Sequence, residues 1–591
     1  MKKYIFSLVC LCCALLPALE GQAHEYPNHP ELRKSDANIV GHILDKNTKE
    51  HLPYITVALK GTTIGTVTDA TGHYFLKNLP EGNFILEVSS VGYKTVTRNV
   101  TLKKGKTLEE DFEIEEDAIA LDGVVVSANR SETTRRMAPT LVNVVDLKLF
   151  ETTNSSTLSQ GLNFQPGVRV ETNCQNCGFQ QVRINGLDGP YTQILIDSRP
   201  VFSALSGVYG LEQIPASMIE RVEVMRGGGS ALFGSSAIAG TINIITKEPL
   251  RNSGQLSHTI TSLGGSSSFD NNTSLNASLV TDDHRAGLYI FGQNRYRSGY
   301  DYDGDGFTEL PKLKNQTVGF RSYLKTSTYS KLTFEYHHMQ EFRRGGDMLN
   351  RPPHEAHIAE QLQHSIDGGS LKFDYFSPDE KNRLSVFASA ANTDRDSYYG
   401  PGNDPLKAYG KTTDLTAMGG AQYVHTFDKC FFMPSDLTAG LEYNRDRLKD
   451  NMWGYNRHTD QTVNIYSAFL QNEWKNDRWG ILIGGRLDKH NMVDNVIFSP
   501  RANLRFNPTQ NINLRLSYSS GFRAPQAFDE DMHIENVGGT VAMIERAKDL
   551  KEEKSQSFSV SADMYHRFGA FQTNLLIEGF YTRLTDVFVL G

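Results

Sequence analysis

The sequence predicts an all-β fold whose main part is an antiparallel barrel that spans a membrane. Three observations lead to this prediction. The chain of 591 residues begins with a segment typical of exported proteins. From Leu250 onward, many segments alternate polar with apolar or aromatic residues, as a wall between lipid and water requires. Beyond the first residues, no run of about 18 apolar residues is long enough for a transmembrane helix, so a membrane-spanning chain of this kind must form a closed barrel.

The first 23 residues have the composition of a secretory signal peptide. Lys2 and Lys3 supply the charged start, residues 4–19 the apolar run, and residues 21–23 the small side chains for cleavage. Export places the remaining chain in an oxidising compartment. Three of the six cysteines lie within residues 1–23. The mature chain keeps an odd number, so at least one of them cannot pair within the chain; they are Cys174, Cys177 and Cys430.

The charge balance excludes nucleic acid as a partner. The chain has 60 Lys and Arg against 68 Asp and Glu, a net charge of −8, whereas binding to a phosphate backbone requires a concentrated basic surface. A chain of this length should divide into several domains. No plausible set of nucleophile, base and orienting residue is present, so the sequence does not predict an enzyme.

Residues 38–115 predict a small β-sandwich. Strand-like runs such as residues 39–44, 54–59 and 84–88 are separated by Asp, Asn, Gly and Pro turns. The order G-x-(I/V)-x-D, then a G-T-x-x-G-T-x-T-D-x-x-G-x-(F/Y) run, then V-G-Y resembles the carboxypeptidase regulatory-like domain. This resemblance implies a periplasmic spacer or docking module without catalytic residues or a metal site.

Residues 221–249 carry the most specific motif in the chain, RVEVMRGGGSALFGSSAIAGTINIITKEP. Two β-branched strands flank a turn in which Gly227, Gly228 and Gly229 let the backbone turn sharply or pass close to another surface. The turn fits no phosphate-binding glycine motif. The order E-R-V-E-V, R-G, S-A-L-F-G, I-N-I-I-T-K resembles the end of the plug domain of TonB-dependent outer-membrane receptors.

This resemblance implies an α/β plug at residues 129–249, seated inside a barrel formed by residues 250–591. A short helix before Pro166-Gly167-Val168 matches the early plug of the family. Gly521-Phe522-Arg523-Ala524-Pro525 resembles the F-R-A-P box of its barrel. Residues 384–388 and 464–474 are among the candidate strands of that barrel.

Residues 116–128 combine an acidic linker with a short β-branched run. In a flexible segment, the backbone N–H and C=O groups of such a run are unspent and can add a strand to another protein. The run resembles the TonB box, through which the family engages a TonB-type energy-transducing partner; an ordinary first strand of the following domain is the competing interpretation. Its candidate residues are Asp122, Val124, Val125 and Val126.

The resemblance also implies a function, namely active uptake of a scarce ligand across the outer membrane of a Gram-negative cell, with the N-terminal domain in the periplasm. The ligand would be an iron chelate, haem or cobalamin, and the histidines and paired cysteines favour a metal-bearing one. Outer-membrane lipid is an implied partner, and a surface lipoprotein is a further candidate. The alternative is a signalling or adhesion module that does not transport. The all-β pattern of residues 39–100 argues against it, because signalling members of the family have a βαβ module there.

Cys174 and Cys177 form a C-x-x-C motif in what the resemblance makes an apical plug loop that faces the external substrate. The compartment favours a local disulfide. Ligation of a soft metal is a second interpretation, although no further Cys or His pair is adjacent in sequence and zinc takes four ligands. Redox catalysis is a third interpretation, but the surrounding sequence lacks the βαβ pattern that it would need. Both cysteines are candidate substrate-binding residues.

Histidines in two polar tracts are further candidates for substrate binding. His354 and His357 precede His364 in residues 345–369, a tract that is expected to be a solvated loop if it binds nothing. His533 follows the F-R-A-P box in residues 529–553. Haem receptors of the family place a ligating histidine after this box, so the resemblance makes His533 a candidate ligand.

The tract from Asp301 to Glu309 predicts a calcium site in an extracellular loop. Asp301, Asp303 and Asp305 present oxygen ligands at alternate positions, Gly306 allows the sharp turn, and Glu309 is a further candidate ligand. Lys312 stands where an EF-type loop has its last glutamate, so a plain acidic turn is the competing interpretation. No other cofactor is expected.

The barrel is expected to be incomplete. Members of the family are plugged barrels of about 22 strands. Residues 250–591 supply about two-thirds of that number if each strand and its connection take roughly 20 to 25 residues. An open barrel would expose an edge to lipid. The sequence therefore leads us to expect a truncated chain.

Overall fold

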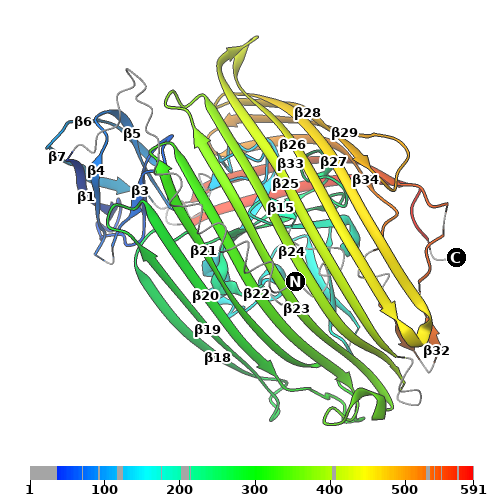
Figure 1. Cartoon of the computed structure of the whole chain (residues 1–591). Helices are drawn as coiled ribbons and strands as arrows, with labels where there is room; N and C mark the ends of the chain where they lie inside the picture. Colours follow the sequence, from blue (N-terminus) through cyan, green and yellow to red (C-terminus); the bar gives the residue numbers. More distant parts are fainter. Residues whose placement is uncertain are drawn as a thin grey trace, which may run out of the picture.

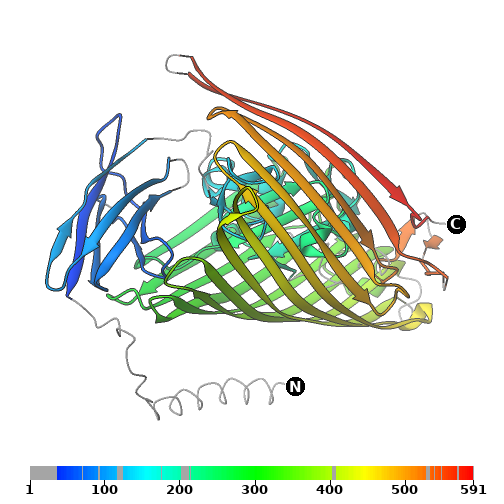
Figure 2. The same cartoon turned by 90° about the horizontal axis from the view of Figure 1, so that it is seen from above.

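The computed structural model describes residues 36–589, except positions 70, 91–92, 116–123, 175, 201–211, 213, 402–407, 528–532, 538–539, 543, 548 and 569–570. The expected signal peptide, most of the acidic linker and Asp122 therefore lie outside the described residues. The chain forms an N-terminal β-sandwich, an α/β unit, and one large curved sheet that encloses much of the α/β unit (Figures 1 and 2).

The N-terminal unit is the predicted sandwich of two four-stranded sheets. One sheet has the order β4-β1-β7 with β8 also paired to β1, and the other has the order β3-β2-β5-β6. Alternate residues of the strands point into a shared apolar core that includes Ile39, Val57 and Leu86. The strands are β1 (Ala37–Asp45), β2 (Thr56–Leu59), β3 (Gly65–Val67), β4 (His73–Leu79), β5 (Gly82–Ser89), β6 (Val96–Leu102), β7 (Thr107–Glu109) and β8 (Phe112–Ile114).

The α/β unit is built on a five-stranded sheet with the order β11-β16-β17-β14-β15. The strands are β11 (Val142–Asp146), β14 (Thr192–Ile196), β15 (Arg199–Pro200), β16 (Ile219–Arg226) and β17 (Gly240–Thr246), and a separate hairpin contains β12 (Val168–Cys174) and β13 (Phe179–Ile184). Short helices α2 (Leu147–Thr152), α3 (Leu158–Leu162) and α5 (Ser230–Phe233) connect them. Helix α3 is the short helix predicted before Pro166.

The glycine-rich motif forms the β16–α5–β17 connection and lies against the large sheet. An added Cβ at Gly228 would be 2.1 Å from Oγ of Ser519, on strand β30 of that sheet. The prediction that these glycines let the backbone pass close to another surface is therefore confirmed. The apolar core of the α/β unit also includes Tyr289 and Phe291 from the wall of the large sheet.

The large sheet has 15 antiparallel strands in sequence order, from β18 at one edge to β34 at the other. This number agrees with about one strand for every 20 to 25 residues, as expected for residues 250–591. The strands are β18 (Ser253–Ser262), β19 (Phe269–Val280), β20 (Ala286–Arg297), β21 (Lys312–Ser327), β22 (Ser330–Gly346), β23 (Ile358–Phe376), β24 (Asn382–Pro401), β25 (Tyr409–Cys430), β26 (Met433–Met452), β27 (Arg457–Lys475), β28 (Trp479–His490), β29 (Ile497–Thr509), β30 (Ile512–Arg523), β33 (Glu553–Phe568) and β34 (Phe571–Thr585). A small hairpin, β31 (Glu535–Val537) and β32 (Thr540–Ala542), lies between β30 and β33.

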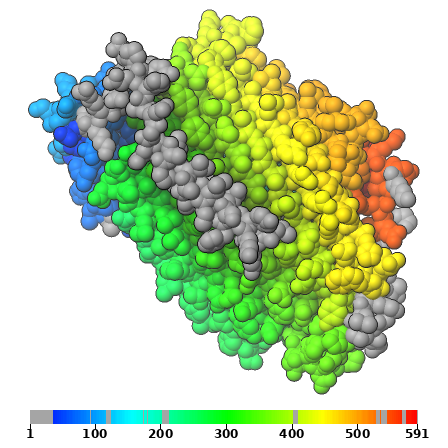
Figure 3. All heavy atoms as spheres, in the orientation of Figure 1, coloured from blue at the N-terminus to red at the C-terminus, as the bar shows by residue number. Residues whose placement is uncertain are grey.

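The two faces of this sheet have the polarity that the alternating sequence predicts. On β29, Asn503 and Arg505 are buried on the concave side, whereas Phe498 and Leu504 are exposed on the convex side. Figure 3 shows part of the convex face as a continuous surface. This arrangement, with apolar side chains outside and charged ones inside, is the reverse of the arrangement in a soluble protein. It suits a wall that contacts lipid. No helix among the described residues is long and apolar enough to cross a membrane.

The two ends of the sheet differ. The sandwich contacts the end with short turns, where the Thr63 N–H donates to the carbonyl of Thr328 at 2.8 Å and Thr66 Oγ1 lies 3.3 Å from His284 Nε2. The longer connections, such as residues 298–311 and 347–357, lie at the opposite end. The tip of the β12–β13 hairpin points to this second end.

Candidate functional site

The segment after the acidic linker is docked on the α/β unit. Val124–Val125 form strand β9, which pairs with β10 (Thr133–Thr134). One carboxylate oxygen of Glu223, on β16, accepts hydrogen bonds from the N–H of Val126 at 2.9 Å, and from the N–H and hydroxyl of Ser127 at 2.8 and 2.7 Å. The expectation that this run has unspent backbone groups is thus wrong for these residues, because a local hairpin and Glu223 use them.

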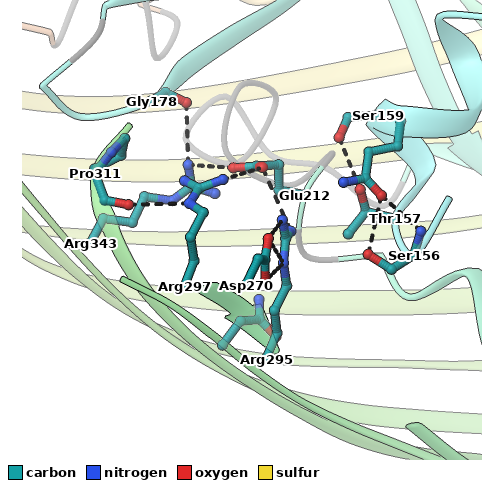
Figure 4. Close-up of polar contacts among 12 residues, drawn as sticks. Ser156, Thr157, Ser159, Gly178, Glu212, Asp270, Arg295, Arg297, Pro311 and Arg343 are labelled. Atoms are coloured by element: carbon teal, nitrogen blue, oxygen red, sulfur yellow. Dashed lines mark hydrogen bonds and ion pairs between the residues drawn. The ribbon is translucent and has the colours of Figure 1, made fainter. Parts of the chain in front are cut away.

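The α/β unit is anchored to the wall by a cluster of arginines around one acid. Glu212 lies 2.7 Å from Arg343 on β22, and 3.6 and 3.5 Å from Arg295 and Arg297 on β20 (Figure 4). Burial alone would raise the pKa of Glu212, but the three guanidinium groups hold it down at about 2. Asp270 completes the cluster with a 2.6 Å ion pair to Arg295.

The C-x-x-C motif forms the tip of the β12–β13 hairpin and packs against Arg343, the arginine that lies closest to Glu212. Arg343 donates from Nη1 to the carbonyl of Gly178 at 3.2 Å (Figure 4). Gly178 has a φ of 68°, a left-handed conformation that glycine adopts without strain. Its N–H donates to the carbonyl of Cys174 at 3.0 Å, and the N–H of Cys177 donates to the Cys174 sulfur at 3.4 Å. The turn therefore brings both cysteine side chains to one side.

A glycine in the wall makes room for this turn. Gly345 on β22 lies beside Asn176, and an added Cβ there would be only 1.8 Å from the carbonyl oxygen of Asn176. Gly345 pairs with Glu360 on β23, and Glu360 pairs with Tyr399 on β24. This row of three strands therefore brings one carboxylate directly to the cysteine turn.

Four ligand-type side chains converge at this place. The Cys174 sulfur is 3.1 Å from a carboxylate oxygen of Glu360, and the Cys177 sulfur is 4.0 Å from Nδ1 of His533. One ligand atom from each of the four residues lies within 4.8 Å of the others. His533 comes from the connection after β30, and its ring meets Tyr399 edge to face at 5.3 Å.

The surroundings of the four groups are largely apolar. Cys177 belongs to a buried cluster with Leu362, Tyr399, Met452 and Ile534. Burial, with smaller contributions from Arg395 and Arg457, lowers the pKa of His533 to about 4. At neutral pH the imidazole is therefore uncharged, with a lone pair on one ring nitrogen.

Neither Cys174 nor Cys177 belongs to a disulfide in the structure. The local disulfide, which the sequence favoured first, is thus not the arrangement found. The Cys174 thiol instead donates a hydrogen bond to the carboxylate of Glu360 at 3.1 Å.

The other candidate histidines lie elsewhere. His354 Nδ1 contacts the hydroxyl of Tyr409 at 2.8 Å, and His357 Nδ1 contacts Asp347 at 2.6 Å. Neither of these two joins the cysteine cluster. The expectation of a solvated loop is wrong for His364, which is only 3% exposed and lies within strand β23 beside Glu341.

The predicted calcium ligands do converge. One oxygen from each of Asp301, Asp303, Asp305 and Glu309 lies within 4.8 Å of the others in an exposed loop. Asp301 already accepts from the N–H groups of Gly304 at 2.7 Å and Gly306 at 2.9 Å, as an acidic turn does without an ion. Calcium binding therefore stays a prediction.

The sequence did not point to Glu212, Glu223 or Glu360. Glu360 is separated from Cys174 by 186 positions, and no spacing rule links a carboxylate on a barrel strand to a plug turn. Glu223 alternates with Val222 and Val224 as a solvent-facing residue of a half-buried strand would, and only the structure shows that it is fully buried.

Three family models match consecutive parts of the chain. They are the CarboxypepD_reg-like domain at residues 39–126, the TonB-dependent Receptor Plug Domain at residues 134–241, and the TonB dependent receptor-like, beta-barrel at residues 245–591.

Curated relatives and solved structures agree with these matches. The Vitamin B12 transporter BtuB of Vibrio vulnificus (strain CMCP6) is 24% identical over 425 residues, covering 69% of this chain and 64% of the relative. The chain therefore spans somewhat less than two-thirds of that relative. The siderophore receptor PirA from Acinetobacter baumannii has a TM-score of 0.61 at 18% identity, over 76% of this chain and 78% of that one. A mutant of the ferric enterobactin receptor PfeA from Pseudomonas aeruginosa also scores 0.61 at 18% identity, over 76% and 71%. At these identities the structures support the fold alone.

Proposed function

The chain belongs to the TonB-dependent receptors, and from this premise we propose that it takes up a scarce, metal-bearing ligand across the outer membrane, driven by a TonB-type partner. The N-terminal sandwich, at the short-turn end of the sheet, would lie in the periplasm. The ligand would enter from the end with long connections. Relatives that bear the names of vitamin B12, siderophore and ferric enterobactin receptors support a metal-bearing ligand.

One observation carries this proposal most directly. The β-branched run at Val124–Val126 is docked on the plug strand β16 through Glu223, while the plug fills the concave side of the barrel wall. A partner that captures this run by strand addition would have to remove it from Glu223. Its pull would then act on β16, a central strand of the plug sheet.

Ligand uptake by whole cells tests the proposal. A strain without the receptor would be supplied with the parent chain, or with a variant lacking residues 124–127, and given cobalamin, haem or a ferric chelate as the only source. We expect the parent to restore uptake of one ligand and the variant to restore none at equal amounts in the outer membrane. Equal uptake by both would contradict an energy-coupled role for this segment.

A further inference from the structure

The cysteine turn, one wall strand and one external connection each supply part of a single donor set. Cys174 and Cys177 come from the plug, Glu360 from β23 of the wall, and His533 from the connection after β30. Two thiols, one carboxylate and one imidazole are the side chains that bind zinc, which is usually four-coordinate and tetrahedral.

The distances fit an ion of this size. Zinc bonds of about 2.0–2.3 Å in a tetrahedron place ligand atoms about 3.3–3.8 Å apart. The two measured separations, 3.1 Å between Cys174 and Glu360 and 4.0 Å between Cys177 and His533, lie on either side of this range. All four donor atoms are within 4.8 Å of one another. Side-chain shifts of about one ångström close the set around an ion.

The charges also fit. Two thiolates and one carboxylate carry three negative charges, so a divalent ion leaves a net charge of −1 on the complex. The apolar side chains of Leu362, Met452 and Ile534 border Cys177 and exclude water, which strengthens the attraction between the ion and its ligands.

We propose that Cys174, Cys177, Glu360 and His533 bind a bare thiophilic divalent cation of the zinc class, and that this ion is the ligand which the receptor takes up. The second half of the proposal rests on the proposed function. Four protein donors complete a tetrahedral ion and leave no position for a chelator. A porphyrin occupies four positions around its own iron and would not fit the same set.

The origin of the donors ties binding to the position of the plug. The two thiols move with the β12–β13 hairpin, whereas Glu360 belongs to the wall. Displacing the hairpin separates these donors and lowers the affinity for the ion. The site therefore holds the ion while the plug is seated and releases it when the plug moves, as a transported ligand requires.

Cobalt and zinc titrations of the full chain, purified in detergent under reducing conditions, test the site. We expect one Co²⁺ per chain with a thiolate-to-cobalt charge-transfer band and the visible bands of tetrahedral Co²⁺, displaced by equimolar Zn²⁺. His533→Ala, Glu360→Gln and the double variant Cys174→Ser, Cys177→Ser should each weaken zinc binding by about 100-fold or more. Cys430→Ser and His354→Ala are matched controls and should bind as the parent does.

Gly345 provides a test that leaves every donor in place. Gly345→Ala should push Asn176 away and weaken binding by about tenfold or more, because its Cβ would be 1.8 Å from the Asn176 carbonyl. Gly292→Ala is the control, since its added Cβ would meet nothing closer than 3.7 Å. No tetrahedral cobalt spectrum in the parent, or parent-like affinity in both the His533 and the double cysteine variants, would overturn the site.

Uptake of labelled zinc by cells separates this inference from the proposed function. Zinc uptake that is lost both without residues 124–127 and in the double cysteine variant supports the inference. If zinc binds to the purified chain but the double cysteine variant takes up zinc normally, the ion is not the transported ligand and that half of the proposal is overturned. If a different ligand is taken up only when residues 124–127 are present, the proposed function stands and zinc as its ligand is refuted.

Discussion

Glu223 should act as the latch for the segment at residues 124–127, and Glu223→Gln tests this directly. One carboxylate oxygen accepts three hydrogen bonds, from the N–H of Val126 and from the N–H and hydroxyl of Ser127. Glutamine keeps the shape and one acceptor oxygen but removes the charge. Arg221 keeps an ion pair with Glu220 at 2.9 Å, so the substitution does not leave a buried arginine without an acid.

The size of the effect follows from the number of bonds. A hydrogen bond to a charged acceptor contributes about 1.5–3 kcal/mol and a neutral one about 0.5–1.5. Losing about 1 kcal/mol at each of three bonds amounts to about 3 kcal/mol, or roughly 100-fold in the local opening equilibrium. The plug sheet itself should remain folded, because its core residues, such as Val222 and Val224, are unchanged.

Amide hydrogen exchange by the purified chain measures this opening residue by residue. We expect the protection of the Val126 and Ser127 amides to fall by roughly 100-fold in Glu223→Gln. Glu248→Gln is the control, because Glu248 pairs with Lys331 of the wall at 3.0 Å rather than with the segment at residues 124–127. Protection within about threefold of the parent in Glu223→Gln would refute the latch.

Three further predictions concern the anchor, the acidic loop and the outer face. The pKa of Glu212 falls from 4.5 in the unfolded chain to about 2 in the folded one, so its ion pairs stabilise the seated plug by roughly 3 kcal/mol above pH 4.5. This stability is lost as the pH drops towards 2. The rate at which a protease cleaves the plug, measured at different pH values, should show the loss, and Glu212→Gln should remove this pH dependence. If the loop at residues 301–309 binds calcium, the variant Asp303→Ala, Asp305→Ala should bind it at least about tenfold more weakly in a calorimetric titration, and equal affinity would rule out the site. Leu516 is 54% exposed on β30 and should face lipid. If it lies near the middle of the bilayer, Leu516→Arg should reduce the free energy of folding into lipid vesicles by about 2–4 kcal/mol. A loss no larger than that caused by Leu516→Ala would contradict a lipid-facing surface.

The sequence predicted the architecture well because the barrel and the plug have strong local signals. Alternation along β29 reports directly which residues face lipid, and the glycine-rich motif constrains the backbone at Gly228, where no side chain fits. Strand length was less predictable. Residues 384–388 are expected as a strand, but β24 runs from Asn382 to Pro401. Beyond the apolar band, this strand is polar on both faces, so its sequence does not alternate. It is held instead by pairing with β23 and β25.

The candidate metal site was only half predictable. Cys174 and Cys177 could be grouped from their C-x-x-C spacing, and His533 could be singled out in a polar loop, but no sequence pattern links His533 or Glu360 to the cysteines. Their proximity depends on β22, β23 and β24 being adjacent, which places Gly345, Glu360 and Tyr399 in one row. Long-range register of this kind is a property of the folded sheet rather than of any local pattern.

Glu223, which holds residues 124–127, and the cysteine turn both belong to the plug, and this leads to a last prediction. Ser127 donates to Glu223 on β16 at 2.7 Å and accepts from Asn243 on β17 at 3.0 Å. The core behind these strands contains Val168 and Val182 of the hairpin that holds the cysteines. Energy supplied at residues 124–127 can release the ion only if the engaged partner lowers the affinity of the chain for zinc.

Linkage then requires that zinc lower the affinity for the partner by the same factor. We expect a factor of about 5 to 150 in both directions, the range of ordinary coupling energies, with the purified strand-pairing domain of the TonB-type partner as the probe. In the double variant Cys174→Ser, Cys177→Ser, zinc should no longer affect partner binding. If zinc affinity is the same with and without the partner domain at saturation, the two ends of the plug are uncoupled, and force applied to the segment cannot be what releases the ion.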